Sequence, residues 1–240
     1  QVRVPEDCST LEEAVEKVHG DDRLTTIVLG KGEHQIDGDY LEISSAMNIV
    51  GDPDVPKDMI VVVGGIMFVP GIQGNCHLQH LRLRRAKQSG VFGMSSFTME
   101  DVLVEQSGGC GVFAADSGGV GRCTNMEVRQ CGDSGVIAGD GASVTLIGAK
   151  TTVHHNCTKK GITSAYGGLG VYGSSSSTIQ LIFPLTKETV SSDNEGGVNW
   201  GAGRGGDILQ IKTIADTSSP ASVVASGETK TTSTSSTAPS

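Results

Sequence analysis

Charged side chains recur at nearly regular intervals along the middle of the chain, in the order Arg84, Glu105, Arg129 and His155. If each interval is one structural repeat, the four side chains stack into a single row. A row of alternating sign is typical of a surface charge ladder, in which each pair of opposite charges contributes about 0.2–1 kcal/mol. Together with Arg82, the same row could instead neutralise an acidic sugar and take a proton from it. The residues alone leave both interpretations open.

The charged row belongs to a longer internal repeat. Four segments align at residues 81–93, 102–114, 126–138 and 152–164, with offsets of 21, 24 and 26 residues. A period in this range, with glycine at the corners and short strands between them, is typical of a β-solenoid. Each coil of a solenoid has an inner face that becomes buried only when the next coil stacks on it.

Several aligned columns are mostly apolar and are expected to point into the solenoid, because side chains two residues apart lie on the same face of a strand. These columns are Leu81, Val102, Met126 and Thr152; Leu83, Val104, Val128 and His154; and Val91, Val112, Val136 and Ile162. His154 is therefore expected inside, as a hydrogen-bonded core histidine. The charged row has the opposite parity and is expected to face solvent.

Two further columns are expected at a bend of the solenoid. One is a polar ladder of stacked side chains, Arg85, Gln106, Gln130 and Asn156, and the other contains small residues, Ala86, Ser107, Cys131 and Cys157. We interpret Cys131 and Cys157 as buried packing thiols, although a separation of about one coil, roughly 5 Å, also permits a disulfide. Asn156 begins a glycosylation sequon, but a side chain that points into the bend could not carry a glycan.

The segment before the repeat predicts a helix over residues 9–19. Ser9 and Glu12 form a capping box, and apolar residues follow at helical spacing. The apolar residues are Leu11, Ala14, Val15 and Val18. We expect this helix to cap the N-terminal end of the solenoid, where strand edges would otherwise be exposed. Short β-type runs follow at residues 25–29, 41–43, 47–50, 60–63 and 66–69, and no second helix is evident.

The chain divides into a β-helix domain over residues 1–212 and a Ser/Thr-rich tail over residues 213–240, whose composition cannot bury a core. We expect the tail to be disordered, with an O-glycosylated stalk as the alternative. The glycine-rich residues 201–206 lack the context of a phosphate loop and are expected to end the solenoid. Trp200 is expected to cover the last coil, with sugar stacking as the alternative. The first residue, Gln1, suggests processing or excision from a longer chain.

Composition narrows the classes of function. The 240 residues include 34 glycines and only 4% aromatic residues, and the net charge of −9 argues against nucleic acid or anionic lipid as the partner. No apolar run reaches the ~18 residues of a transmembrane helix. The six cysteines form neither a CxxC pair nor a zinc spacing, and His77 and His80 are expected on opposite faces of a strand. We therefore predict neither a metal nor a cofactor.

The pattern as a whole resembles the right-handed parallel β-helix, or pectin-lyase-like, superfamily. The opening VPEDCSTLEEAVEKV and the run TIVLGKGEHQI are similar to its usual entry, and residues 181–201 are similar to the ending of small β-helix proteins of algae and protists. The resemblance covers about residues 2–212 and implies an all-β, single-stranded solenoid of roughly seven to nine coils. It implies little about function, because the superfamily includes lyases, hydrolases, epimerases and non-catalytic repeats.

The resemblance transfers no catalytic residue, because the motifs of polygalacturonases, pectin methylesterases and C5-epimerases are absent or lie outside the solenoid face. We therefore expect a non-catalytic structural or binding module that contacts a polysaccharide or a protein through Arg84, Glu105, Arg129 and His155. The alternative is a lyase or C5-epimerase of acidic polysaccharide, with Arg82, Arg84, Glu105 and His155 as catalytic candidates. A third possibility is a subunit of a larger assembly. A secreted, cell-surface or lumenal location is favoured over the cytoplasm, and the oligomeric state is open.

Overall fold

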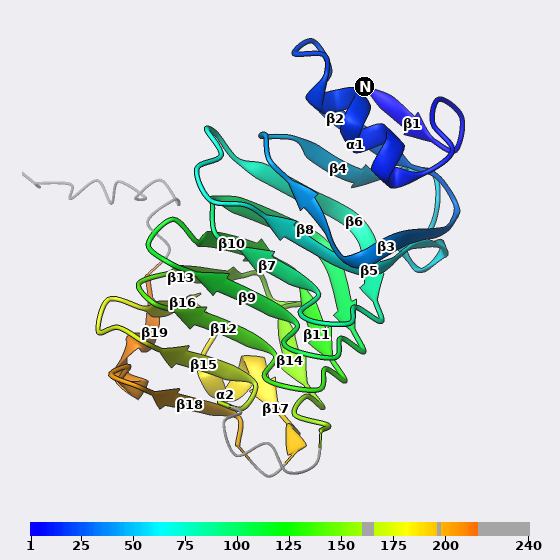
Figure 1. Ribbon diagram of the computed structural model, residues 1–240. Coiled ribbons are helices and arrows are strands. Elements are labelled where there is room, and N and C mark those ends of the chain that lie inside the picture. The colour runs from blue at the N-terminus through cyan, green and yellow to red at the C-terminus, as the bar shows by residue number, and fades with distance from the viewer. Residues whose placement is uncertain (160–165, 196–197, 216–240) are drawn as a thin grey trace, which may run out of the picture.

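The chain winds into a parallel β-helix, the solenoid that the repeat predicted (Figure 1). The computed structural model describes residues 1–159, 166–195 and 198–215. Among these residues every strand pairing is parallel. No helix in this part of the chain is long and apolar enough to cross a membrane.

Three ladders of strands run along the solenoid, and successive coils add one strand to each. The first ladder contains β1 (Val2–Val4), β2 (Thr26–Leu29), β4 (Asn48–Gly51), the first halves of β6 (Cys76–Arg84) and β8 (Phe97–Glu105), β10 (Val120–Thr124), β13 (Ser143–Ile147), β16 (Thr178–Ile182) and β19 (Ile211–Ile214). The second contains the first halves of β3 (Gly32–Ile43) and β5 (Ile60–Phe68), the second halves of β6 and β8, β11 (Glu127–Arg129), β14 (Thr152–His154) and β17 (Ser191–Ser192). The third contains the second halves of β3 and β5, β7 (Val91–Gly93), β9 (Val112–Ala115), β12 (Val136–Gly139), β15 (Leu169–Tyr172) and β18 (Trp200–Gly203).

The register confirms the predicted stacking of the first three repeats and corrects the fourth. Leu81 pairs with Val102 and Val104 with Val128, as expected. Val128 then pairs with Val153 rather than with His154, so the last offset is 25 residues and not 26. A slip of one residue moves every side chain to the other face of a strand. Val153 therefore points inward, and the prediction that His154 lies in the core is wrong.

Each corner of the solenoid is turned by a residue with left-handed backbone, a conformation that asparagine and aspartate tolerate better than most other residues. All the non-glycine left-handed residues except Cys157 form three columns: His80, Asp101 and Asn125; Arg85, Gln106, Gln130, His155 and Asp193; and Asp116, Asp140 and Arg204. The second column contains the predicted polar ladder, except that His155 occupies the place expected for Asn156. Its members have φ values between 50° and 55°.

A column of glycines follows the second corner because a side chain there would collide with the core. A methyl group at Gly135 would overlap Cγ1 of Val153 and lie 2.8 Å from the Gly168 oxygen. We expect Gly135→Ala to lower the free energy of unfolding by about 1–3 kcal/mol, the range for overpacked cores. Urea denaturation of the purified protein measures this effect.

Gly20→Ala is the matched control for Gly135→Ala. The Gly20 backbone has φ −87°, and the nearest atom to an added methyl group is 3.5 Å away. This variant should be neutral or slightly stabilising, because alanine restricts the unfolded chain without straining the folded one. Equal losses in both variants would contradict the packing argument.

Helix α1 (Leu11–His19) covers the N-terminal end of the solenoid and buries the four predicted apolar residues. Its capping residue differs from the prediction. The Thr10 hydroxyl, not that of Ser9, accepts the Glu13 backbone N–H at 3.1 Å. The Glu13 carboxylate receives the backbone N–H and the hydroxyl of Ser9, both at 2.8 Å. Glu12 instead accepts the backbone N–H of Asp37 at 3.0 Å, which ties the helix to β3.

The solenoid continues past the glycine-rich stretch at which it was predicted to end. Leu169 pairs with Val136 and takes the inward position expected for Ile162, which lies outside the described residues. Trp200 pairs with Leu169 and is half-buried against the core. The glycine-rich stretch does not end the solenoid, because residues 201–203 belong to β18 and the chain continues through the 3-10 turn η3 (Ile208–Gln210) into β19. A short helix not foreseen from the sequence, α2 (Lys187–Val190), precedes β17.

Candidate functional site

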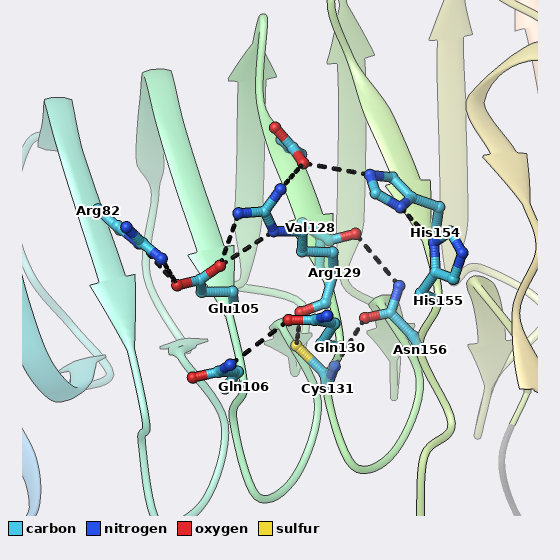
Figure 2. A network of polar contacts seen from close by, with 11 residues as sticks. Arg82, Glu105, Gln106, Val128, Arg129, Gln130, Cys131, His154, His155 and Asn156 are labelled. Atoms are coloured by element: carbon cyan, nitrogen blue, oxygen red, sulfur yellow. Dashed lines mark hydrogen bonds and ion pairs between the residues drawn. The ribbon is translucent and has the colours of Figure 1, made fainter. Parts of the chain in front are cut away.

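The charged row lies on the outer face of the second ladder, where all of it except Arg84 belongs to one network that also includes Arg82 and His154 (Figure 2). Glu105 is at its centre and is only 1% exposed, so the prediction that it faces solvent is wrong. Arg82 Nε donates to Glu105 Oε1 at 2.6 Å, and Arg129 Nε donates to Glu105 Oε2 at 3.0 Å. The two arginine side chains shield the carboxylate from water, as long side chains with charged ends commonly do.

The network extends from Arg129 to the histidines. Arg129 Nη1 donates to Glu127 Oε1 at 2.9 Å, and His154 Nε2 lies 3.2 Å from the same oxygen. The Nδ1 atoms of His154 and His155 are 2.7 Å apart. His154 therefore holds the place in the row that was predicted for His155, which lies at the corner and is exposed.

Arg84 pairs with Glu105 in the register but does not contact its carboxylate. Its guanidinium instead forms an ion pair with Glu33 from β3. Arg84, Arg82 and Arg129 are thus all engaged by carboxylates, and their side chains are 19%, 23% and 33% exposed. A ligand or a substrate would have to displace these ion pairs, so the assignment of the row to binding or catalysis stays a prediction.

The corner beside this network contains a buried asparagine instead of two stacked cysteines. Asn156, rather than Cys157, follows Cys131 in the small-residue column, and its Oδ1 accepts the Cys131 backbone N–H at 3.1 Å. Asn156 is fully buried, which leaves the sequon side chain no room for a glycan. In the polar ladder, Gln106 Nε2 donates to Gln130 Oε1 at 3.5 Å.

All six cysteines are free thiols in the structure. Burial raises the pKa of Cys123 to about 12, and of Cys131 and Cys157 to about 11. A thiol reacts as the thiolate, so these side chains are held in their unreactive form at neutral pH. Cys123 and Cys131 pack in the buried core, as the repeat predicted for Cys131. Cys157 lies one position past the column and is only partly buried, so the prediction of a buried packing thiol there is wrong.

A polar pocket of about 450 Å³ lies at the first corner, beside the loop that contains the 3-10 turn η1 (Lys57–Met59). Its lining residues are Val50, Gly51, Pro53, Gln79, His80, Glu100 and Asp101. Asp101 Oδ2 lies 2.8 Å from His80 Nδ1, and Asp101 Oδ1 accepts from Lys57 Nζ at 2.6 Å. Burial alone would raise the pKa of Asp101, but these two partners lower it overall.

His80 and Asp101, the two titratable side chains at the corner of this pocket, bind each other and the neighbouring loop rather than pointing to a free space. His80 Nε2 lies 3.0 Å from the Val55 oxygen, so both of its ring nitrogens are occupied. His77 contacts Thr98 and Gln79 instead and does not converge with His80. In the described parts of the chain, no group of three or more His, Cys, Asp and Glu side chains could hold a metal ion.

An outer row of aromatic side chains on the third ladder was missed by the sequence analysis. Tyr40 and Phe92 have ring centroids 6.1 Å apart, Phe92 and Phe113 are 5.1 Å apart, and Phe113 and Tyr172 are 5.9 Å apart. Tyr166 stacks on Tyr172 at 5.7 Å and 14°. This aromatic row contains all three tyrosines and two of the five phenylalanines, and every member is half-buried.

Glycines on the same face make the aromatic row possible. A side chain at Gly65 would lie 2.8 Å from the Tyr40 ring, and one at Gly139 would overlap the Tyr172 ring. Only the alignment of Phe92 with Phe113 in two successive repeats was visible as a sequence signal. The tyrosines reach the row diagonally across these glycines, which a column alignment does not reveal.

The aromatic row ends in a shallow hollow of about 240 Å³. Its lining residues are Cys110, Phe113, Asp133, Ile137, Tyr166, Tyr172 and Arg204. Burial, followed by the nearby carboxylate of Asp140, raises the pKa of Tyr172 to about 12, so its hydroxyl stays protonated at neutral pH. The hollow therefore combines aromatic faces with a hydroxyl, a carboxylate and a guanidinium, which are the groups that orient small polar ligands.

No protein-family model matches the chain, and no curated protein matches it either. Among solved structures, the chain is similar to the A-module of the mannuronan C-5 epimerase AlgE4 from Azotobacter vinelandii. The match has 11% sequence identity and a TM-score of 0.25, and it covers 85% of this chain and 92% of that chain. A likeness this distant carries no statement about activity.

Proposed function

We propose that the protein binds a polysaccharide along the aromatic row of the third ladder without cleaving it. The observation that carries the proposal is the stack of half-exposed rings that runs from β3 to β15. The chain has few aromatic residues, yet more than half of them lie in this row. Aromatic rings bury large areas at low entropic cost, and their negative faces attract the C–H groups of a pyranose ring.

Charge favours a neutral polysaccharide over an acidic one. Asp133 lines the hollow, Asp140 lies beside the Tyr172 hydroxyl, and Asp39 precedes Tyr40. Carboxylates at these places can accept hydrogen bonds from sugar hydroxyls, but they repel uronates. Two cations, Arg204 in the hollow and Lys87 at 4.0 Å from Asp39, offset these three carboxylates only in part. The densest arginines of the chain lie on the second ladder, where Glu33 and Glu105 already engage them.

A lyase or epimerase would need a base within reach of the sugar, and the charged row offers a poor one. Glu105 is occluded by its two arginines, and Glu127 is shared between Arg129 and His154. His155 is exposed, but it lies at the corner with its Nδ1 2.7 Å from that of His154. In the polar pocket, Asp101 is engaged by Lys57 and His80. These contacts support binding without turnover as the function of the solenoid.

The proposal is tested by retention of the protein on insoluble neutral polysaccharides, with polyuronates in the same panel. The double variant Phe113→Ala and Tyr172→Ala should weaken binding at least about tenfold, because aromatic anchors dominate interface energies and tenfold equals about 1.4 kcal/mol. Polyuronates should bind weakly or not at all.

The matched control is Met59→Ala, which removes an apolar side chain that is 47% exposed and lies outside the aromatic row. Its binding should equal that of the unmodified protein. Unchanged binding by the double variant would overturn the proposed site. Release of unsaturated uronates or new reducing ends would overturn the proposed absence of catalysis.

A further inference from the structure

The two ends of the solenoid are built differently. Helix α1 covers the N-terminal end, where its four apolar residues are buried. At the other end, β17, β18 and β19 each have a pairing partner on one side only within the described parts of the chain. Unpaired edge strands are templates for another strand, and natural proteins protect them with short strands, charges or a cover.

The three edges are not equally protected. β17 has only two residues, and β19 carries Lys212. β18 has the sequence WGAG, with no charge and three small residues, so another backbone can approach it closely. Ala202 pairs with Val171, whose side chain points into the solenoid, yet Ala202 itself is exposed. Val171 beneath it is fully buried, so within the described residues the inward side of this ladder meets water only at its last strand, at Ala202.

Exposed apolar side chains gather in the same coils. The structure exposes Phe183, Val198, Ile208 and Leu209 by 68%, 44%, 38% and 76%, and only two other large apolar residues of the described chain are comparably exposed. Four such residues in the last two coils are the apolar surface that an interaction at this end of the solenoid would bury. The acidic residues Asp193 and Glu195 precede β18, and Arg204 follows it.

We propose that β18 pairs antiparallel with β18 of a second copy of this chain, so that two solenoids join at their C-terminal ends. A two-fold axis through the paired strands places Arg204 of each copy near Asp193 and Glu195 of the other copy. The surface is therefore complementary in charge to itself. The capped N-terminal end cannot accept a further copy, so the assembly closes as a dimer and does not grow into a filament.

The test is sedimentation equilibrium of the full chain over a series of concentrations. We expect a dimer, and we expect Ala202→Lys to raise its dissociation constant at least about tenfold, because a charge on an edge strand blocks pairing. Val120→Lys is the control, since Val120 is 45% exposed in a strand that is paired on both sides. This variant should dimerise normally.

Exchanging the charges of Arg204 and Glu195 distinguishes pairing with a second copy of this chain from binding to any other partner. Arg204→Glu alone should weaken the dimer several-fold, and Arg204→Glu combined with Glu195→Arg should restore it, because each copy then offers the reversed pair. A monomeric mass at every concentration would overturn the proposal. A dimer that is unaffected by Ala202→Lys, or not restored by the exchange, would overturn the role of β18.

Discussion

Asn156→Ala is expected to lower the free energy of unfolding by about 3–5 kcal/mol, among the largest effects of any single change in this chain. The Asn156 side chain is fully buried and makes three hydrogen bonds. It accepts the Cys131 N–H at 3.1 Å and donates to the Val128 oxygen at 3.2 Å and to Asn194 Oδ1 at 3.1 Å. Alanine would leave these buried groups unsatisfied beside a cavity.

The effect of Asn156→Ala can be measured by urea denaturation and located by hydrogen exchange. The Cys131 amide should lose its protection at once, because its acceptor is gone, while amides near α1 should lose protection only by the change in global stability. Gln106→Ala is the control. Gln106 lies at the same corner one column away, is exposed, and makes one long bond, so its removal should cost less than about 0.5 kcal/mol.

A loss below about 1 kcal/mol for Asn156→Ala would contradict the role of this side chain. It would mean that Asn194 or water replaces the missing partners. Asn194 is the natural candidate, because its Oδ1 already accepts the Asn156 backbone N–H at 3.0 Å. The double variant Asn156→Ala and Asn194→Ala distinguishes replacement by Asn194 from replacement by water. If Asn194 is the substitute, the two losses in stability are not additive, because the two residues share partners.

The architecture of the solenoid was largely readable from the sequence. Apolar columns such as Leu81 with Val102 repeat because every coil must bury its inner face on the next one. The same need for burial explains the four apolar residues of α1, which were also predicted. Such patterns are redundant over many residues, so a single misassigned position does not hide them.

Predictions of finer features were wrong where the position of a single residue decides the outcome. The similar pairs Gln130-Cys131 and Asn156-Cys157 suggested an offset of 26, but the structure stacks Asn156 on Cys131. This slip moved His154 from the expected core to the outer row. An asparagine satisfies the buried bend better than a cysteine because it can both donate and accept.

The outer surface was the least predictable part. Glu105 shares its parity with exposed residues, yet two arginines from neighbouring coils cover it. The aromatic row depends on rings that lean over glycines of adjacent coils, such as Tyr40 over Gly65. Side-chain direction across coils follows from packing, and a one-dimensional repeat does not contain it.

Glu105→Ala is the second change with a large expected effect, a loss of about 3 kcal/mol in the free energy of unfolding. Removing one member of a buried ion pair leaves its partners uncompensated, which costs about 3–5 kcal/mol in fully buried sites. Arg82 and Arg129 remain 23% and 33% exposed, so water can relieve part of the cost. The effect should therefore lie at the low end of the range.

The control for Glu105→Ala is Glu127→Ala, because Glu127 is 33% exposed and its loss should cost less than about 1 kcal/mol. Denaturation in low and high salt tests whether Glu105 behaves as a shielded ion pair or as a surface charge. A shielded ion pair responds weakly to salt, so the difference between the unmodified protein and Glu105→Ala should persist at high ionic strength. If the difference vanishes, Glu105 behaves as a surface charge, and a ligand could reach it.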